Sequence, residues 1–475
     1  MNDRNSEAGS GRAATVASVA ALVARARAAQ HIANGYDQAR TDELVAAAGW
    51  AIIEPGRNRT LAELAVADTG IGDVEDKVRK NHRKTLGLLR DLAGAKTVGV
   101  IAEDSALGIV EIARPVGVVC AVTPSTNPAA TPANKIINAL KARNAVIVAP
   151  SPKGWSSAAR LVDFIHEQFL RIDAPADLVQ LLPSPVDKAS TLELMRQCDL
   201  VVATGSQANV RAAYASGTPA FGVGAGNVAG IVDETADVAA AAAHVLRSKT
   251  FDNATSCSSE NSLILVGAAQ EPMLAALALR GAVMLDAAQK SRLQALMWPD
   301  GKLSPAVIGQ SAARIAQSAG LGLSAPRILM VEESGVGDDH PFSGEKLSPV
   351  LAIYRVATFE EAARLVERIY AFQGAGHSVG LHTTRADRAL ALGLTLPVAR
   401  VIVNQAHCIA TGGSFDNGLP FSLSMGCGTW GRNNFSDNMT VRQFMNITRV
   451  SRPIAEQMPT EDQIFGALFS KFGRA

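Results

Sequence analysis

Residues 117–149 read GVVCAVTPSTNPAATPANKIINALKARNAVIVA, and this stretch indicates the class of fold. The apolar run 117–122 has the length and composition of a buried strand, residues 132–141 have helical periodicity, and residues 145–149 form a second apolar run. A strand, a helix and a second strand in this order predict two strands of a parallel sheet with a helix on its face.

The same alternation of strands and helices continues along most of the chain. It runs on to a helix at 206–216, and a second region of alternation extends from a strand at 228–233 to a strand at 400–403. The sequence therefore predicts an α/β fold with two parallel-sheet lobes of the Rossmann type and a cleft between them. The predicted domains are residues 1–222, residues 223–427, and a return segment with the C-terminal tail at residues 428–475.

The N-terminal part of the chain precedes the first sheet and is predicted to be helical. Its segments have amphipathic or highly charged helical patterns, the first starting by Thr15 and the last covering residues 73–92. Two β-rich runs, 96–102 and 107–113, follow these helices.

The composition argues against two classes of partner. The formal net charge is +1 and aromatic residues make up 5% of the chain, so no surface is expected that would hold nucleic acid or an anionic membrane. The apolar run 13–24 is too short to span a bilayer. The five cysteines include no CxxC pair, which favours free thiols, no metal site and a cytoplasmic location.

Among these cysteines, Cys257 has the most polar surroundings. It lies in FDNATSCSSE, residues 251–260, between a predicted helix and a predicted strand. A lone cysteine is as often a small buried apolar residue as a reactive one. Hydroxyls and amides on both sides are unsuited to a packing role, so the pattern favours a thiolate that attacks a carbonyl group.

Two further polar segments follow predicted strands. Asn127 lies in TPSTNP, residues 123–128, where a side-chain amide is a suitable donor to an oxyanion, although Asn and Pro are also common in ordinary turns. Ser206 ends the segment ATGS, residues 203–206, as the N-cap of a predicted helix. Free N–H groups there suit a cofactor pyrophosphate, although simple capping is the commoner reason for such a Ser.

Two other patterns are rejected as functional sites. The segment GVGAGN at residues 222–227 looks like a dinucleotide fingerprint, but a strand is predicted after it, whereas the fingerprint opens a helix. The histidines do not cluster at metal-ligand spacing, so structural roles are favoured for His340, His377, His382 and His407.

Taken together, six segments resemble the CoA-acylating branch of the aldehyde dehydrogenase superfamily, over about residues 22–453. They are TPSTNP at 123–128, ATGS at 203–206, GTPAFGVGAGN at 217–227, KTFDN at 249–253 with Cys257, EKLSPV at 345–350 and LSMGCGTWG at 423–431. The resemblance implies an aldehyde dehydrogenase-like fold. It also implies a homo-oligomer, a dimer or a tetramer, built by a small β element at 96–113 and by the tail after Gly428.

The resemblance implies roles for individual residues. Cys257 matches the nucleophile, and Asn127 matches the amide that holds the oxyanion together with the backbone N–H of Cys257. The positions that match cofactor contacts are Gly205 and Ser206 at the pyrophosphate, Ser151 and Lys153 at the adenosine ribose, and Glu345 at the nicotinamide ribose, and Thr123 is a further cofactor-binding position.

Val223 stands where the hydrolytic branch of the superfamily has the Glu that activates water. Valine cannot accept a proton, so a thioester on Cys257 is expected to resist water and to pass to the thiol of coenzyme A. The implied order is addition of Cys257 to the aldehyde, hydride transfer to a nicotinamide cofactor, and acyl transfer to coenzyme A.

The expected substrate is a small polar aldehyde. Donor groups surround the matched substrate pocket, and they suit an anionic group, although the same hydroxyls also satisfy local backbone groups in many proteins. As a whole the chain is similar to the acylating sulfoacetaldehyde dehydrogenases, which use NADP. The pocket residues are Thr255, Ser256 and Ser258 beside the cysteine, with His407 and Thr411 in the loop QAHCIATGGS at 405–414.

The sequence leaves alternatives for the cofactor and for the class of reaction. Residues 149–153 contain no carboxylate that would exclude a 2′-phosphate, and Lys153 suits one, so NADP is expected with NAD as the alternative. The other readings are an acetaldehyde or propanal type of acylating enzyme using NAD, a hydrolytic aldehyde dehydrogenase, an acyl-phosphate reductase and a non-catalytic scaffold. Dependence of steady turnover on coenzyme A separates the acylating enzymes from the last three readings, and a panel of aldehydes separates the two acylating types.

Overall fold

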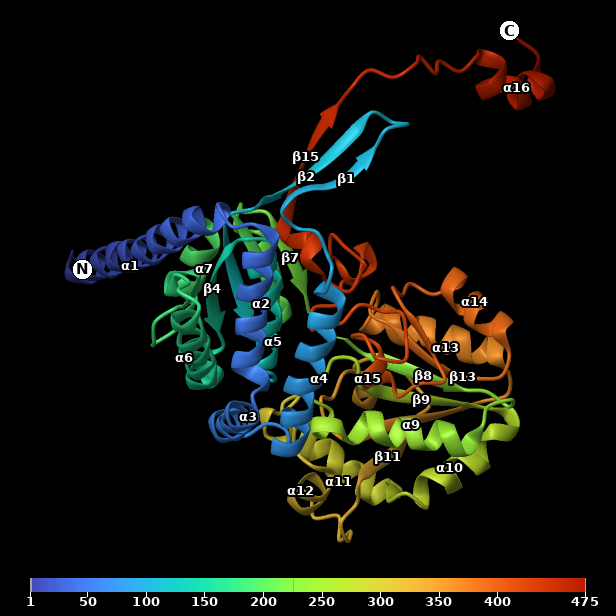
Figure 1. Ribbon diagram of the computed structural model, residues 1–475. Helices are drawn as coiled ribbons and strands as arrows, with labels where there is room; N and C mark the ends of the chain where they lie inside the picture. The colour runs from blue at the N-terminus through green and yellow to red at the C-terminus, as the bar shows by residue number, and fades with distance from the viewer. Residues whose placement is uncertain (1, 225, 475) are drawn as a thin grey trace.

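The computed structural model describes residues 2–224 and 226–474 of the chain. Two parallel sheets with their helices form the body of the molecule, and a small antiparallel sheet projects from it (Figure 1). This arrangement confirms the predicted α/β fold with two parallel-sheet lobes and a small β element. In the described residues no helix is both long and apolar enough to cross a membrane.

The first sheet has the strand order β5-β4-β3-β6-β7 and contains the stretch that indicated the fold. Every residue of β3 and β4 is buried, which explains their uninterrupted apolar sequence. The strands are β3 (Val118–Thr123), β4 (Ala145–Pro150), β5 (Val179–Leu181), β6 (Leu200–Thr204) and β7 (Ala220–Val223). The connecting helices are α5 (Ala130–Lys141), α6 (Trp155–Arg171), α7 (Lys188–Gln197) and α8 (Gln207–Tyr214).

The second sheet has the order β10-β11-β12-β9-β8-β13-β14, all parallel. Its strands are β8 (Val228–Val232), β9 (Glu260–Val266), β10 (Ala282–Met284), β11 (Ile328–Glu332), β12 (Val350–Val356), β13 (Val379–His382) and β14 (Val401–Val403). Its helices are α9 (Val238–Thr250), α10 (Gln270–Ala278), α11 (Ala287–Met297), α12 (Ala312–Ser318), α13 (Phe359–Phe372), α14 (Ala386–Thr395) and α15 (His407–Ala410).

The glycine-rich segment joins the two sheets. It leads from β7 directly into β8, so a strand follows it as predicted, and the standard phosphate-loop interpretation is correctly rejected. The domain boundary placed at 222 stays a prediction, and the first sheet ends at Val223.

The N-terminal part of the chain is helical as predicted, although the bounds of the helices differ from the prediction. The helices are α1 (Asn2–Asn34), α2 (Gln38–Ile53), α3 (Pro55–Thr69) and α4 (Val74–Leu92), so the first helix begins well before Thr15. Asp73 caps α4 by accepting a hydrogen bond from the N–H of Asp76. Helix α4 lies between the lobes, since it contacts α5 on one side and the 3-10 turn Phe251–Ala254 on the other (Figure 1).

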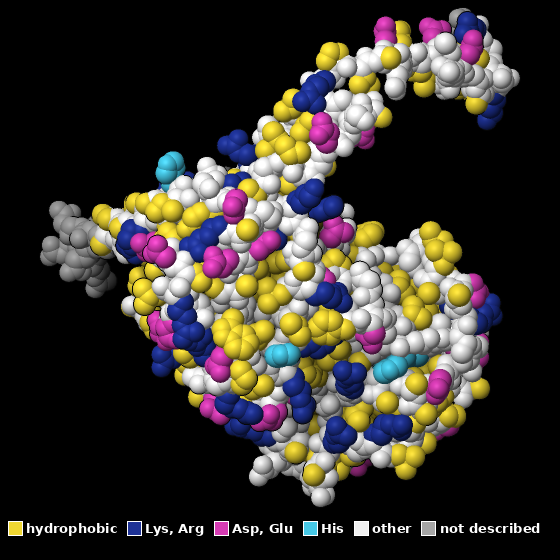
Figure 2. Space-filling model, in the orientation of Figure 1, with side chains coloured by type: hydrophobic (Ala, Val, Ile, Leu, Met, Phe, Trp, Pro, Cys, Tyr) yellow, Lys and Arg dark blue, Asp and Glu magenta, His cyan; other side chains and the backbone are white. Residues whose placement is uncertain are grey.

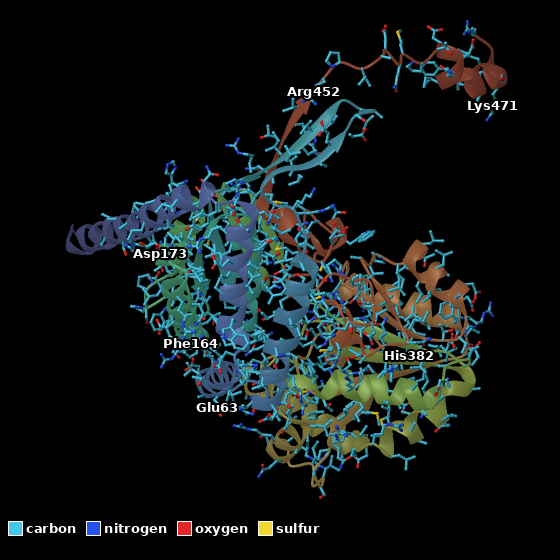
Figure 3. All side chains as sticks on the ribbon, in the orientation of Figure 1. Glu63, Phe164, Asp173, His382, Arg452 and Lys471 are labelled. Carbon is cyan, nitrogen blue, oxygen red and sulfur yellow. The ribbon has the colours of Figure 1, made fainter. Side chains whose placement is uncertain are left out.

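The third sheet joins distant parts of the chain. Strand β2 (Ile109–Pro115) pairs antiparallel with β1 (Gly99–Asp104) and with β15 (Met445–Ser451). After β15 an extended segment leads to α16 (Glu461–Phe472), which lies away from the body, and Figure 3 labels Arg452 and Lys471 along this arm. The predicted return segment therefore contributes a strand to the small sheet.

Candidate active site

Cys257 lies in the turn between α9 and β9, and the turn begins with unusual backbone. Asp252, Asn253 and Ala254 have φ values of 50°, 52° and 59°, a left-handed conformation that non-glycine residues rarely adopt. Three such residues in succession persist only where the surroundings hold them, and strain of this kind clusters at functional sites.

The carboxylate of Asp252 holds this turn in place. It accepts hydrogen bonds from Lys80 Nζ at 2.5 Å and Lys77 Nζ at 3.1 Å, both on α4, and from Thr255 Oγ1 at 2.8 Å. Burial alone would raise the pKa of Asp252, but Lys80 and Lys77 hold it below its usual value. Helix α4 is therefore attached through a buried ionic cluster to the turn that carries Cys257.

The thiol of Cys257 faces the imidazole of His377, which lies between α13 and β13 in the second lobe. Its Sγ lies 3.3 Å from Nε2 of His377, and Nδ1 of His377 lies 2.7 Å from Ser378 Oγ. Burial, then Glu345, raises the pKa of Cys257, while burial, then Arg400, lowers the pKa of His377 to about 3. The resting pair is therefore a neutral thiol and a neutral imidazole whose Nε2 can accept the thiol proton.

Asn127 is oriented by Lys80. The loop after β3 places Asn127 Oδ1 2.8 Å from Lys80 Nζ. An ammonium group only donates, so the oxygen of the amide faces Lys80 and the Nδ2 donor faces away from it. That Nδ2 makes one long contact, 3.5 Å to Thr126 Oγ1, and it remains available to a ligand.

Gly226 closes the site on the side of Glu345. Its N–H donates to Glu345 Oε1 at 3.2 Å, and a side chain at this position would lie 2.4 Å from the carbonyl oxygen of Cys257. It would also lie 2.9 Å from His377 Cδ2, so only glycine fits. Burial raises the pKa of Glu345 to about 8.

A small cavity of about 30 Å³ begins beside Cys257 and contains part of the predicted substrate pocket. Ser256 and Ser258 line it, whereas Thr255 donates to Asp252 and Thr411 donates to the carbonyl of His407. His407 Nδ1 faces the carbonyl oxygen of Ser258 at 2.8 Å, and burial lowers the pKa of His407 to about 4. The full lining is Lys80, Arg83, Lys84, Asn127, Phe251, Ser256, Ser258, Cys408, Ile409, Gly412, Ser422, Leu423 and Met425.

The predicted cofactor residues of the first sheet lie together. Thr123 ends β3 opposite Pro150 of β4, and Ser151 donates its N–H to the carbonyl of Thr123 at 3.0 Å. Gly205 follows the neighbouring strand β6, and Ser206 caps α8 by accepting from the N–H of Asn209. These residues share the carboxyl edge of adjacent parallel strands, where α/β sheets bind nucleotides.

Three features fit a nucleotide, two at this edge and one in the second lobe. At the edge, Thr123 Oγ1 is buried without a partner among the described residues. In the second lobe, the carboxylate of Glu345 accepts one hydrogen bond from the described residues, at Oε1 from the N–H of Gly226. Lys153 is exposed in the 3-10 turn Pro152–Gly154, and no acidic side chain of the described chain pairs with it.

Sequence reasoning missed the cationic residues of α4 and His377. The signal for the first was Lys77, Lys80 and Lys84, which recur at helical spacing on one face and are all buried. For His377 no local signal exists, because its contact with Cys257 joins residues 120 positions apart. The structural role favoured for His377 was incomplete, since its ring reaches the thiol. In the described chain, no three His, Cys, Asp or Glu side chains lie close enough to hold a metal.

Comparisons with known proteins agree with this geometry. The model of the aldehyde dehydrogenase family matches residues 3–294. The chain is 66% identical over 464 residues to the acylating sulfoacetaldehyde dehydrogenase of Cupriavidus necator, covering 97% of this chain and 94% of that protein.

Two solved structures are also similar. An acetylating aldehyde dehydrogenase from Geobacillus thermoglucosidasius superposes with a TM-score of 0.90 at 36% identity, covering 95% of this chain and 99% of that one. A propionaldehyde dehydrogenase from Rhodopseudomonas palustris, with bound CoA and an acylated cysteine, gives 0.81 at 25% identity, covering 91% and 97%.

Proposed function

This chain belongs to the aldehyde dehydrogenase family and is of the acylating type, and we propose that it converts sulfoacetaldehyde reversibly to sulfoacetyl-CoA with NADP. The observation that carries the proposal is the pairing of Cys257 with His377 in a site that has Val223 where a water-activating carboxylate would stand. The substrate follows from the high identity to an acylating sulfoacetaldehyde dehydrogenase over nearly the whole chain.

The first step is addition of Cys257 to the aldehyde. Sγ bonds to the carbonyl carbon as its proton passes to Nε2 of His377, and the carbonyl oxygen becomes an oxyanion. We propose that Asn127 Nδ2 and the backbone N–H of Cys257 hold that oxyanion. Lys80 is the positioning residue, because it fixes the orientation of the Asn127 amide.

The second half of the reaction releases the acyl group. When bound, NADP would supply the acceptor for the hydride on the carbon attached to Sγ, and loss of that hydride would leave a thioester on Cys257. The thiol of coenzyme A attacks this thioester and loses its proton to solvent, and Sγ is expelled and takes back the proton held on Nε2 of His377, which regenerates the neutral pair. Val223 ends β7 as a buried apolar side chain and cannot deprotonate water, so the thioester persists until coenzyme A arrives.

We place the cofactor along the carboxyl edge of the first sheet. Thr123, Gly205 and Ser206 would contact the pyrophosphate, with the N-terminus of α8 supplying free N–H groups. Ser151 and Lys153 would hold the adenosine ribose, and the exposed Lys153 ammonium suits the 2′-phosphate of NADP. Glu345 would accept hydrogen bonds from the nicotinamide ribose.

One observation favours a second function, hydrolysis of the thioester. Glu345 is the first charged group that raises the pKa of Cys257, and its own pKa is raised by burial to about 8, a suitable value for a base that activates water. In the proposed mechanism the carboxylate, whose Oε1 accepts the N–H of Gly226, contacts the nicotinamide ribose instead.

A substrate panel tests the proposal. Sulfoacetaldehyde, acetaldehyde, butyraldehyde and succinate semialdehyde are each supplied with NAD or NADP, with and without coenzyme A. The expected result is the highest kcat/KM for sulfoacetaldehyde with NADP, one burst of NADPH per site without coenzyme A, and steady turnover with it. Full turnover without coenzyme A, giving free acid, would establish the hydrolytic alternative instead.

We also propose that the chain forms a homo-oligomer through its projecting arm. Helix α16 presents a largely exposed apolar face, and β1 and β15 are the open edges of the small sheet among the described residues. Exposed apolar surface of this kind marks an association site. The exposed side chains are Ile464, Phe465, Leu468 and Phe472, with exposures of 60%, 46%, 53% and 69%.

A further inference from the structure

The cavity beside Cys257 holds two cations that lack an acidic partner. Lys84 Nζ donates to the carbonyl oxygens of Gly412 at 2.6 Å and Gly413 at 3.5 Å. Arg83 Nη2 donates to Ser414 Oγ at 2.8 Å and to Gly413 at 3.2 Å. No carboxylate in the described part of the chain forms an ion pair with either residue, in contrast to Lys80 and its partner Asp252.

Both cations keep donors for a ligand. An ammonium has three N–H donors and a guanidinium has five, and the contacts above use two or fewer of each. Lys84 is 8% exposed, and burial, then the charge of Arg83, lowers its pKa to about 7. Buried charges in proteins are normally paired or hydrogen-bonded to an opposite charge. An anion in the cavity would supply that charge.

The loop opposite α4 is built to leave this space open. A side chain at Gly412 would lie 2.7 Å from Lys84 Nζ and 2.6 Å from the carbonyl oxygen of Ser422. Glycine at this position therefore lets the ammonium reach both the backbone carbonyls and the cavity. Ser256, Ser258 and Ser422 are the polar uncharged side chains beside these cations in the lining, while Leu423 and Met425 supply apolar contact.

We propose that this cavity is the subsite for the sulfonate of the substrate, with Arg83 and Lys84 as its charge partners. The inference rests on the proposed function, because it identifies the residues that select an anionic aldehyde at that same site. Ser256 and Ser258 both line the cavity and flank Cys257, so the head group would lie one short carbon linker from the reacting carbonyl. A cavity of about 30 Å³ has room for about two water molecules, which suits a compact head group and excludes a long chain.

A groove lined by more basic than acidic side chains, the latter being Asp73 and Asp76, adjoins this cavity. The groove has a volume of about 1250 Å³ and shares Arg83, Phe251 and Ile409 with the cavity lining. Figure 2 shows Lys and Arg side chains gathered on this face, over α4 and α9. Positive charge along a cleft raises the local concentration of an anionic substrate. The arginines of the groove are Arg59, Arg79, Arg83, Arg247, Arg280 and Arg327.

The test compares a charged with an uncharged aldehyde. In Lys84→Met, the ratio of kcat/KM for sulfoacetaldehyde to kcat/KM for propanal is expected to fall by about 100-fold. Lys84→Arg keeps the charge and retains most of the preference. Arg83→Gln, at a half-buried position, provides a second variant should Lys84→Met fail to fold. Ethanesulfonate, which has no carbonyl group, should inhibit the wild type competitively and Lys84→Met only weakly.

Lys141→Met is the matched control. Lys141 is also a buried lysine, but it pairs with Asp42 at the far end of α5 and does not line the cavity. Its substitution is expected to lower the thermal midpoint without changing the ratio of the two kcat/KM values. A preference for sulfoacetaldehyde that survives in both Lys84→Met and Arg83→Gln would overturn the subsite. Absence of the preference in the wild-type enzyme, with coenzyme A-dependent turnover of other aldehydes, would instead overturn the proposed substrate.

Discussion

Lys80 Nζ lies 2.8 Å from Oδ1 of Asn127 and 2.5 Å from Oδ2 of Asp252, so one ammonium joins the proposed oxyanion donor to the turn that carries the nucleophile. The two partners come from different lobes, and Lys80 comes from a helix between them. The relative placement of Asn127 and Cys257 therefore depends on a side chain that belongs to neither segment.

Substituting Lys80 with Met is expected to lower kcat by about 10–100-fold, because the Asn127 amide is then free to rotate and oxyanion donors are worth at least this much. Lys77→Met is the matched variant, since Lys77 also pairs with Asp252 but contacts the Thr126 carbonyl rather than the Asn127 side chain. Lys77→Met should lower kcat much less than Lys80→Met does, while the two variants lose a similar amount of stability.

A double-mutant cycle tests whether Lys80 affects kcat through the side chain of Asn127. If Lys80 acts through Asn127, Lys80→Met should have little further effect on kcat in an Asn127→Ala background. Fully additive losses would show that Lys80 acts elsewhere.

His377→Ala is expected to lower kcat by about 100-fold or more through loss of the proton acceptor. Alkylation of Cys257 by iodoacetamide should slow in parallel. Because the pKa of His377 is lowered to about 3, the imidazole stays neutral between pH 5 and 8, so wild-type alkylation should show no acid limb near 6.5. Such a limb, absent from His377→Ala, would contradict the neutral pair.

Val223→Glu is expected to convert part of the product from acyl-CoA to free acid. The new carboxylate stands where the hydrolytic branch has its base, so the Cys257 thioester should become susceptible to water. Separation of acid from acyl-CoA by chromatography measures the partition. The control is Val223→Gln, whose side chain has nearly the shape of Glu but no carboxylate. If Val223→Gln gave as much free acid as Val223→Glu, the new carboxylate would not be the base that activates water.

Binding of ethanesulfonate is expected to weaken as pH rises above 7. The pKa of Lys84 is about 7 in the empty site against an ordinary 10.5, and the anion binds the protonated form, so the inhibition constant should rise about tenfold per pH unit. Burial, then Arg83 and Lys80, lower this pKa, and Cys408 and Cys257 would raise it only as thiolates. The slope should disappear in Lys84→Met, and an unchanged slope there would assign the titration to another group.

The lowered pKa of Lys84 also makes the free energy of unfolding depend on pH. Lys84 is protonated in the unfolded chain up to its ordinary pKa but loses its proton near pH 7 in the folded enzyme. Between these values the unfolded state binds more protons, so the contribution of Lys84 to the free energy of unfolding rises with pH. Urea titrations of wild type and Lys84→Met between pH 6 and 9 should therefore diverge.

Removal of residues 453–475 is expected to reduce the oligomer to a smaller species, because it deletes α16 and its exposed apolar face. Size-exclusion chromatography with light scattering gives the mass directly. Leu468→Asp, on the same face, should act in the same direction without shortening the chain. An unchanged mass in both variants would place the interface elsewhere.

Much of the fold could be predicted from the sequence because it depends on local patterns. The strand, helix and strand of residues 117–149 are confirmed as β3, α5 and β4. Strands such as β10 and β11 were missed, because short apolar runs do not by themselves distinguish strand from helix. The third strand of the small sheet, β15, was missed as well, since its pairing with β2 joins segments more than 300 residues apart.

By itself, the sequence determined the two α/β lobes, the polar turn around Cys257 and the position of Asn127 after a strand. Apolar periodicity and turn chemistry are written in neighbouring residues, and they suffice for these features. Only the tertiary structure decided that Lys80 and Lys84 turn inward and that His377 reaches Cys257. A lysine on a charged helix is usually solvated, and its burial depends on partners such as Asp252 and Gly412 that folding brings from another lobe.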